Sequence, residues 1–153
     1  MANNEGKPRE PGPGGMFRRV LVGFDGSAEA QRALRVAVAL AADLQGEAHV
    51  LLVVRPPAHV ETPEEQARAA EAEKENLSRG LADVQNLTHQ RSQVSAEVVY
   101  ADEPAHALAA YAEEHGFDLV VVGDHGRERT THRGIGQSVE ALLRHHPCPV
   151  LVV

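Results

Sequence analysis

The most informative stretch of the sequence is a glycine-rich segment at residues 123–138, which reads GDHGRERTTHRGIGQS. It follows a short apolar run and precedes a segment with helical periodicity, so we expect a loop between a strand and a helix. Glycine has no β-carbon, and its main-chain N–H can therefore approach an anion closely. The start of the following helix adds unpaired N–H donors at a positive dipole end. The segment therefore predicts a site for a polyphosphate group.

The charge of this loop is opposite in sign to that of the whole chain. The chain holds 15 Lys and Arg against 22 Asp and Glu, a formal net charge of −7. A local positive excess in such a chain favours an anionic ligand. Glycines that only permit a turn, and arginines that only face solvent, would explain the same residues, and spacing alone leaves both interpretations open. The loop sets five basic residues, His125, Arg127, Arg129, His132 and Arg133, against Asp124 and Glu128.

Length and composition limit the class of protein. The chain has 153 residues, with 42% apolar and 24% charged residues, which is typical of one globular domain with a core. Its negative charge repels nucleic acids and anionic membranes, so neither is an expected partner. A single cysteine, Cys148, cannot form an intramolecular disulfide, which favours the cytoplasm.

The first 15 residues contain four glycines, three prolines and no apolar run. We therefore expect a flexible tail at 1–15, without the apolar core of a signal peptide, and a domain at 16–153. No run of 18 apolar residues occurs, so no membrane-spanning segment is expected.

Short apolar and helical segments alternate through the rest of the chain. Continuous β-branched runs at 20–24, 49–54, 119–122 and 150–153 predict strands buried on both faces, and the alternating pattern of 93–100 predicts an edge strand. The intervening segments predict four helices: one capped by Ser27 and stopped by Gly46, one with a capping box at Thr62, one from Pro104 to Gly116, and one between Gly136 and Pro147.

This alternation predicts a Rossmann-like α/β fold: a three-layer, open, five-stranded parallel sheet with helices on both faces. If the third strand lies at an edge, the strand order is 3-2-1-4-5. Its topological switch point is between strands one and four, and ligands bind such sheets outside the carboxyl ends of the strands there. Phe24 at the end of strand one and Asp25 after it, with Val122 at the end of strand four and Gly123 after it, are therefore candidate binding residues.

Several nucleotide-binding motifs are absent. The sequence has no G-x-x-x-x-G-K-[ST], so a P-loop hydrolase is not expected. The first strand-to-helix turn, GFDGS, is not G-x-G-x-x-G, which disfavours a dinucleotide dehydrogenase.

Three motifs together resemble the universal stress protein family over residues 16–153. They are VLVGFDGS, GDHG-x9-GQS and the closing LRHHPCPVLVV. The resemblance implies an adenine nucleotide alpha hydrolase-like fold, a dimer, and in many members bound ATP or a related nucleotide such as AMP. It implies that Asp25 lies beside the phosphates or their Mg²⁺, that Val54 meets adenine, and that Gly123, Gly126 and Gly136 hold the phosphates. The remaining candidate contacts in this loop are His125, Arg127, Gln137 and Ser138.

Two positions depart from the pattern of the family. Gln137 stands where Ser or Thr is usual, with Ser138 one place later, and its amide could still donate to phosphate. Asp124 stands where a small neutral residue is commoner. A carboxylate within ~4 Å of phosphate would cost about 1–4 kcal/mol at a surface-like dielectric, so we expect Mg²⁺ there or a side chain turned outward.

The last strand predicts a partner. Residues 149–153 are apolar on both faces, yet the expected order places them at an edge, where an uncovered strand promotes aggregation. Pairing with a second copy across a two-fold axis would cover it, in agreement with the family's dimer. Burial under the chain's own tail is the alternative.

Three functions remain open on the sequence. The first is a regulatory module that binds ATP or AMP and needs no catalytic residue. The second is a slow ATPase or phosphotransferase, with Asp25 and Mg²⁺ polarising phosphate and His125 or His132 moving a proton. The third is an interaction protein, with a protein partner and no nucleotide.

Other reactive residues have simpler explanations. His145, His146 and Cys148 lie too close to prolines and point in too many directions to form a metal site. We expect Cys148 to be a buried thiol and Ser27 to be a helix cap, not a nucleophile.

Overall fold

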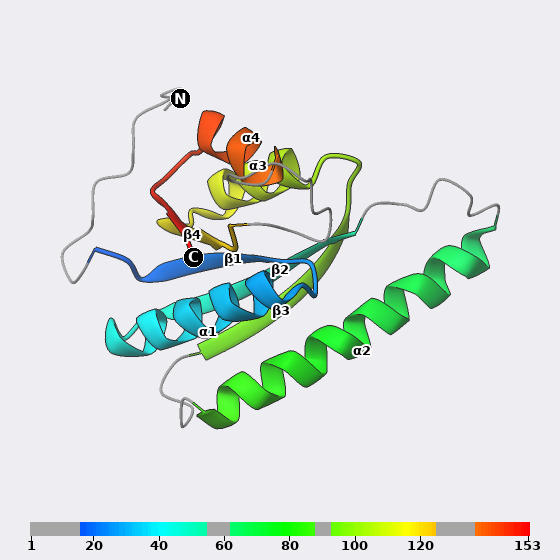
Figure 1. Ribbon diagram of the computed structural model, residues 1–153, viewed down its shortest axis with the longest axis horizontal. Helices are drawn as coiled ribbons and strands as arrows, with labels where there is room; N and C mark the ends of the chain where they lie inside the picture. Colours follow the sequence, from blue (N-terminus) through cyan, green and yellow to red (C-terminus); the bar gives the residue numbers. More distant parts are fainter. Residues whose placement is uncertain (1–15, 55–61, 88–92, 125–136) are drawn as a thin grey trace.

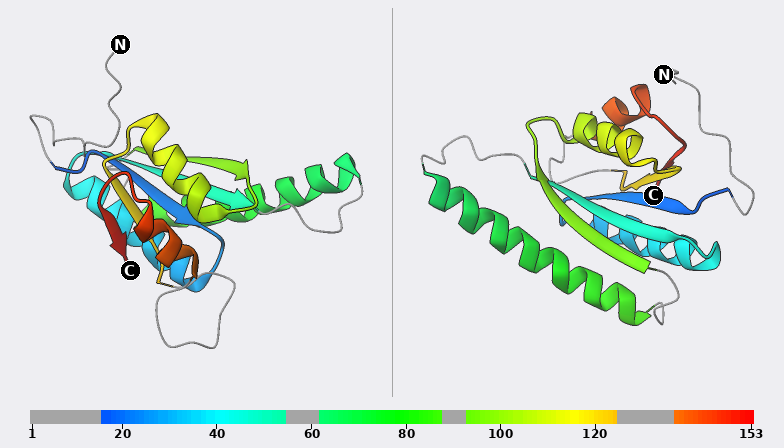
Figure 2. Two further views of the ribbon diagram at one scale, coloured as in Figure 1. Left: turned by 90° about the horizontal axis from the view of Figure 1, so that it is seen from above. Right: turned by 180° about the vertical axis from the view of Figure 1, so that it is seen from behind.

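The computed structural model describes residues 16–54, 62–87, 93–124 and 137–153. Within these residues five strands and four helices alternate, and the strands form one parallel sheet in the order β3-β2-β1-β4-β5 (Figure 1). Helices α1 and α2 lie on one face of the sheet and α3 and α4 on the other (Figure 2). The predicted order and layers are confirmed. The elements are β1 (Arg19–Phe24), α1 (Ala28–Asp43), β2 (Glu47–Val54), α2 (Pro63–Leu87), β3 (Gln93–Tyr100), α3 (Pro104–His115), β4 (Leu119–Val122), α4 (Gln137–Arg144) and β5 (Val150–Val152).

Two apolar clusters fill the spaces between the layers. Successive residues of a strand point to opposite faces, and in β1 the side chains of Val20 and Val22 join the cluster under α1 while Leu21 joins the cluster under α3 and α4. All three are fully buried, as are Val120 and Val121 of β4. The continuous apolar runs of the sequence therefore mark the central strands, as predicted.

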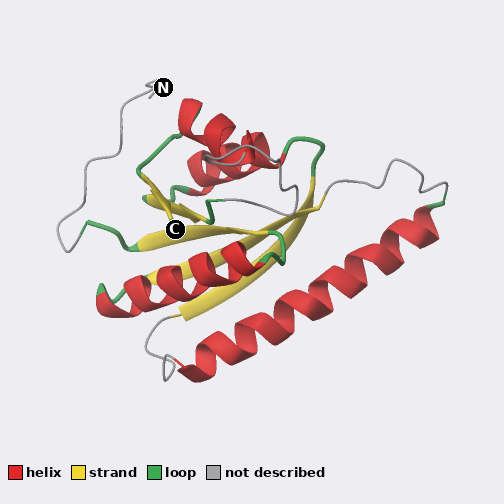
Figure 3. Cartoon of the chain, viewed as in Figure 1, coloured by secondary structure: helices red, strands yellow, loops and turns green. Residues whose placement is uncertain are grey.

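The outer strand β3 has one partly wet face, as its alternating pattern predicts. Ser95 and Glu97 are exposed, whereas Val94 and Val98 pack against the cluster under α1. In the alternation of 93–100 Ala96 and Tyr100 stand on the same side as Val94 and Val98, where cover is expected, but both are exposed, Tyr100 by 50%. Position at the edge explains this, because within the described part of the chain β3 has a neighbouring strand on one side alone, and Tyr100 is its last residue. Helix α2 is the longest helix described and lies beside α1 and β3 (Figure 3).

The helix ends follow the residues that predict them. The Ser27 hydroxyl accepts a hydrogen bond from the N–H of Ala30 at 3.1 Å and caps α1. The Thr62 hydroxyl accepts from the N–H of Glu65 at 3.4 Å before α2. Gly116 ends α3 in the left-handed region with φ 67°.

The end of α1 differs from its prediction in one respect. The helix stops at Asp43, but the residue that turns the chain into the left-handed region is Gln45, with φ 55°. Gly46 serves a different purpose, because a β-carbon there would lie 2.5 Å from the carbonyl oxygen of Arg18. That oxygen also accepts the N–H of Glu47 at 2.8 Å. Glycine is needed at position 46 because the segment before β1 lies against the start of β2.

Separate substitutions of Gln45 and Gly46 test this account of the end of α1. We expect Gly46→Ala to destabilise the protein by about 1–3 kcal/mol, because the new methyl group meets main-chain atoms that are held in the sheet. Gln45→Gly should be neutral or stabilising by up to about 1 kcal/mol, because it removes the left-handed strain of a residue with a β-carbon. Urea unfolding measures both, and equal losses in the two variants would contradict the assignment.

Candidate functional site

The turns that follow β1 and β4 meet at one edge of the sheet. The two strands pair in parallel, from Val20 with Leu119 to Val22 with Val121. Since parallel strands end at the same edge, Asp25 after β1 and Asp124 after β4 emerge together at the point where the strand order reverses. The two strands that were expected to flank a ligand site are therefore neighbours in the sheet.

The turn after β1 holds Asp25 in a fixed position. Its carboxylate oxygen Oδ1 accepts the N–H of Ser27 at 2.9 Å, while Gly26 takes a positive φ of 81°. This is an Asx turn, and it leads directly into the capped first turn of α1. The turn thus places a carboxylate at the carboxyl end of β1, where an oxygen ligand could meet a hard cation such as Mg²⁺.

Gly123 is needed for packing, whatever the loop binds. A β-carbon on Gly123 would lie 2.8 Å from both the carbonyl carbon and the β-carbon of Glu29, in the first turn of α1. The end of β4 therefore lies directly against the start of α1. A side chain at this position would push the two elements apart.

Asp124 is turned toward α1 and paired there. Its Oδ1 accepts a hydrogen bond from Arg32 Nη2 at 3.1 Å, and the same nitrogen donates to the main-chain oxygen of Val153 at 3.0 Å. The N–H of Asp124 also donates to that oxygen, at 3.0 Å. Arg32 lies 92 positions away on a helix, and its role was not predicted from the sequence. The charge that departs from the family pattern thus has a counter-charge within the chain.

The other predicted residues divide into three groups. Phe24 and Val122 are each 7% exposed and pack in the two different apolar clusters. Val54 ends β2, Gln137 begins α4, and Ser138 is exposed beside it at the start of that helix. Four candidates lie outside the described residues: His125, Gly126, Arg127 and Gly136.

The structure assigns Cys148 to the core. The thiol is buried, and burial, aided by the nearby Asp118 carboxylate, raises its pKa to about 11. Such a thiol is inert at neutral pH, as the sequence predicts. Among the described residues no group of three or more His, Cys, Asp or Glu side chains could hold a metal ion. No helix in this part of the chain is long and apolar enough to cross a membrane.

The comparison with protein families decides the identity of the domain. The family model described as "Universal stress protein family" matches residues 16–153. The chain belongs to the universal stress protein family. Universal stress protein YxiE of Bacillus subtilis is 33% identical over 149 residues, which span 90% of this chain and 99% of that protein.

Solved structures of the family have the same fold. Universal stress protein UspA from Lactobacillus plantarum has a TM-score of 0.76 and 26% identity, over 90% of this chain and 97% of that one. The universal stress protein from Archaeoglobus fulgidus in complex with dAMP has a TM-score of 0.63 and 21% identity, over 90% of this chain and 98% of that one. These likenesses agree with the five-stranded sheet and its order.

The raised pKa of Cys148 predicts slow labelling. At pH 8 a thiol whose pKa is about 11 holds about 100-fold less thiolate than one near 9, so we expect reaction with Ellman's reagent to be slower by at least that factor. Cys148 is the one cysteine of the sequence, so the signal has a single source. The protein unfolded in guanidinium serves as the control and should react at the rate of an ordinary thiol. Rapid labelling of the folded protein would contradict the burial of Cys148.

Proposed function

We propose that the chain is a cytoplasmic regulatory protein of the stress response that binds ATP or AMP in the crevice between β1 and β4. The observation that carries the proposal is the parallel pairing of these two strands at the switch point of the sheet. That pairing brings the Asp25 turn and the start of the glycine-rich segment to one edge. The dAMP complex of the family member from Archaeoglobus fulgidus supports an adenine nucleotide as the class of ligand.

The residues at this edge suit a phosphate group and its cation. Asp25 offers carboxylate oxygens to Mg²⁺ when ATP is the ligand, and the exposed Ser138 lies in the first turn of α4, where main-chain N–H groups are unpaired. The pairing of Asp124 with Arg32 lowers the electrostatic cost of bringing phosphate near this carboxylate. We assign the phosphate-holding role to Gly126 and Gly136 on the spacing of the sequence.

The regulatory form of the proposal is the one that needs no catalytic residue. The Asp25 carboxylate is engaged in its own turn, and Ser27 is engaged as a cap. The two histidines that a slow ATPase would use, His125 and His132, lie outside the described residues, so release of phosphate must decide between the two forms. A bound nucleotide would act by holding the segment after Asp124 in one arrangement for a partner.

Calorimetric titration tests the ligand. We expect Mg-ATP, ATP or AMP to bind, and the double variant Gly126→Val, Gly136→Val to lose binding by at least tenfold, because the added side chains fill the space that phosphate needs. A matched control is Gly23→Ala, at a glycine whose added β-carbon would meet the movable end of the Leu108 side chain at 3.0 Å.

Three outcomes separate the functions. Absence of heat with all ligands at millimolar concentration would rule out nucleotide binding and leave the interaction protein. Binding with release of phosphate over hours would indicate the slow ATPase or phosphotransferase. Binding without release would support the regulatory protein. Unchanged affinity in the double variant would contradict the assignment of the two glycines.

We further propose that the protein is a homodimer through residues 149–153. The strand β5 ends the sheet, and beyond β4 it has no second neighbour among the described residues. Leu151 is 37% exposed on this edge, and Leu143 of α4 is 36% exposed. An apolar edge of this kind is covered in a symmetric pair, with each copy's strand adding to the other's sheet.

Two variants that each introduce a carboxylate at one edge of the sheet test the dimer. We expect Leu151→Asp to weaken self-association by at least tenfold, because an unpaired carboxylate would be buried in the interface. Tyr100→Asp changes the opposite edge at a more exposed side chain and should leave association unchanged. Sedimentation equilibrium measures both. Removal of residues 1–15 addresses the alternative of a covering tail: a monomeric full-length protein whose shortened form associates or aggregates would favour the tail.

A further inference from the structure

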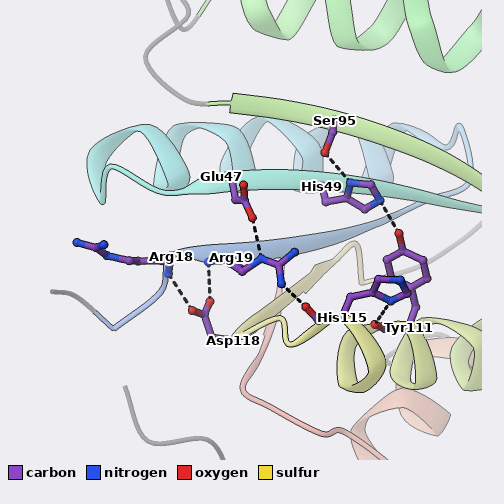
Figure 4. Close-up of polar contacts among 8 residues, drawn as sticks. All are labelled: Arg18, Arg19, Glu47, His49, Ser95, Tyr111, His115 and Asp118. Atoms are coloured by element: carbon purple, nitrogen blue, oxygen red, sulfur yellow. Dashed lines mark hydrogen bonds and ion pairs between the residues drawn. The ribbon is translucent and has the colours of Figure 1, made fainter. Parts of the chain in front are cut away.

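A second polar cluster lies at the other end of the sheet, where the strands begin (Figure 4). At its centre His49 of β2 lies between the edge strand β3 and helix α3. Its Nδ1 is 2.6 Å from the Ser95 hydroxyl, and its Nε2 is 3.0 Å from the Tyr111 hydroxyl. The Tyr111 hydroxyl also donates to Glu97 Oε2 at 2.5 Å. One imidazole ring therefore connects three elements of the fold.

The direction of each hydrogen bond in the series from Ser95 through His49 and Tyr111 to Glu97 can be deduced. Tyr111 has one hydroxyl proton, which it gives to the Glu97 carboxylate, so its oxygen must accept from His49. The proton of the neutral imidazole is therefore on Nε2. Its Nδ1 is then an acceptor, and the Ser95 hydroxyl donates to it. Every donor in this hydrogen-bonded series is matched to an acceptor while His49 is neutral.

Rings pack around His49 on the side of α3. The His49 and Tyr111 rings are stacked, with centroids 5.5 Å apart and planes at 5°. Tyr111 stacks in turn on His115 at 4.0 Å, and Phe117 lies 5.7 Å from His49. The side chain of His49 is 17% exposed. This packing withholds water from the ring, so a charge on His49 would lose hydration.

The charged neighbours of His49 come from every element around it, and they oppose one another. On β3, Glu97 Oε2 is 3.8 Å from Nε2 and favours a charged ring. Glu47 on β2 also favours it, while Arg19 on β1 and His115 on α3 disfavour it. Burial is the largest effect, and the pKa of His49 is lowered from its usual value.

Arg19 cannot readily move away from this cluster. Its Nε donates to the Glu47 carboxylate at 2.7 Å, its guanidinium also donates to the carbonyl oxygen of His115, and it lies over the Phe117 ring at 4.6 Å. A cation on His49 would thus be repelled by a second cation that has three partners of its own.

We propose that His49 is a proton-sensitive clamp, which holds β3 and the last turns of α3 on β2 when it is neutral and releases them in mildly acidic solution. A proton from solvent binds at Nδ1, which then can no longer accept from Ser95. The Ser95 oxygen must accept instead, with its own proton turned to solvent. The imidazolium is then packed against a poorly hydrated stack of rings, where the repulsion from Arg19 and His115 and the loss of hydration oppose the attraction of Glu97.

The sign of the effect follows from the two states of the ring. In the opened state His49 has its ordinary pKa near 6.5, whereas in the closed state its pKa is lower. The opened state therefore binds more protons below about pH 6.5, and acid favours opening. A fully excluded proton would raise the opening equilibrium about tenfold between pH 7.5 and 5.5, which is the upper limit of the effect.

Hydrogen exchange of backbone amides provides the test. After correction for the intrinsic rate, we expect amides of β3 and the last turns of α3 to lose protection by severalfold, up to about tenfold, between pH 7.5 and 5.5. His49→Gln keeps a neutral donor toward Tyr111 and cannot gain a proton, so its protection should not change with pH in these segments. His106→Gln replaces an exposed histidine of α3 and should keep the full effect. An equal loss of protection in His49→Gln, or none in the unaltered protein, would overturn the clamp.

Titration of the ring gives a readout that does not depend on the stability of the His49 variant. By NMR we expect the His49 resonances to titrate below pH 6.5 in the unaltered protein. Glu97→Gln removes the main charge that favours imidazolium while leaving an oxygen to accept from Tyr111, so the midpoint should fall further. A midpoint at or above 6.5, or a rise in the Glu97 variant, would overturn the proposal.

Discussion

The parallel pairing of β1 with β4 is the constraint on which the remaining structure depends. Both strands are buried on both faces, and their amino ends are joined by one carboxylate. The N–H groups of Arg18 and Arg19 donate to the two Asp118 oxygens at 3.0 Å each, and the N–H of Asp118 donates to the carbonyl oxygen of Arg19 at 3.0 Å. Because the register is fixed at this end, the turns at the other end must emerge together. The meeting of the two turns is thus a consequence of how the two central strands begin.

The two ends of the sheet carry different sets of side-chain contacts. At the carboxyl ends the Asp25 carboxylate accepts the N–H of Ser27 in the turn that leads into α1. At the amino ends the side chains of His49, Tyr111 and Glu97 form one hydrogen-bonded series. The histidine that we propose as a clamp therefore lies at the opposite end of the sheet from the proposed nucleotide site.

Much of the fold could be predicted from the sequence because its signals are local. A run of apolar residues, a Ser27 cap or a glycine at the end of α3 acts within a few positions, and the strand order follows from one additional inference about the edge. The interactions that were missed join distant positions. Arg32 and Asp124 are 92 residues apart, and Tyr111 reaches His49 across 62. Gly46 was assigned to the helix end, while its close neighbour is Arg18, which is near only after β1 and β2 pair.

The pair formed by Arg32 and Asp124 shows why a departure from the family pattern need not conflict with an anionic ligand. Both side chains are about half exposed, so the direct stabilisation from such a pair is at most about 1 kcal/mol. Its more important effect is geometric. The same Arg32 nitrogen donates to the Asp124 carboxylate and to the Val153 oxygen, and the N–H of Asp124 donates to that oxygen as well, so Arg32 draws the carboxylate toward α1. The apolar edge strand and the start of the glycine-rich segment are therefore held by the same three groups, which keep the negative charge of Asp124 against α1.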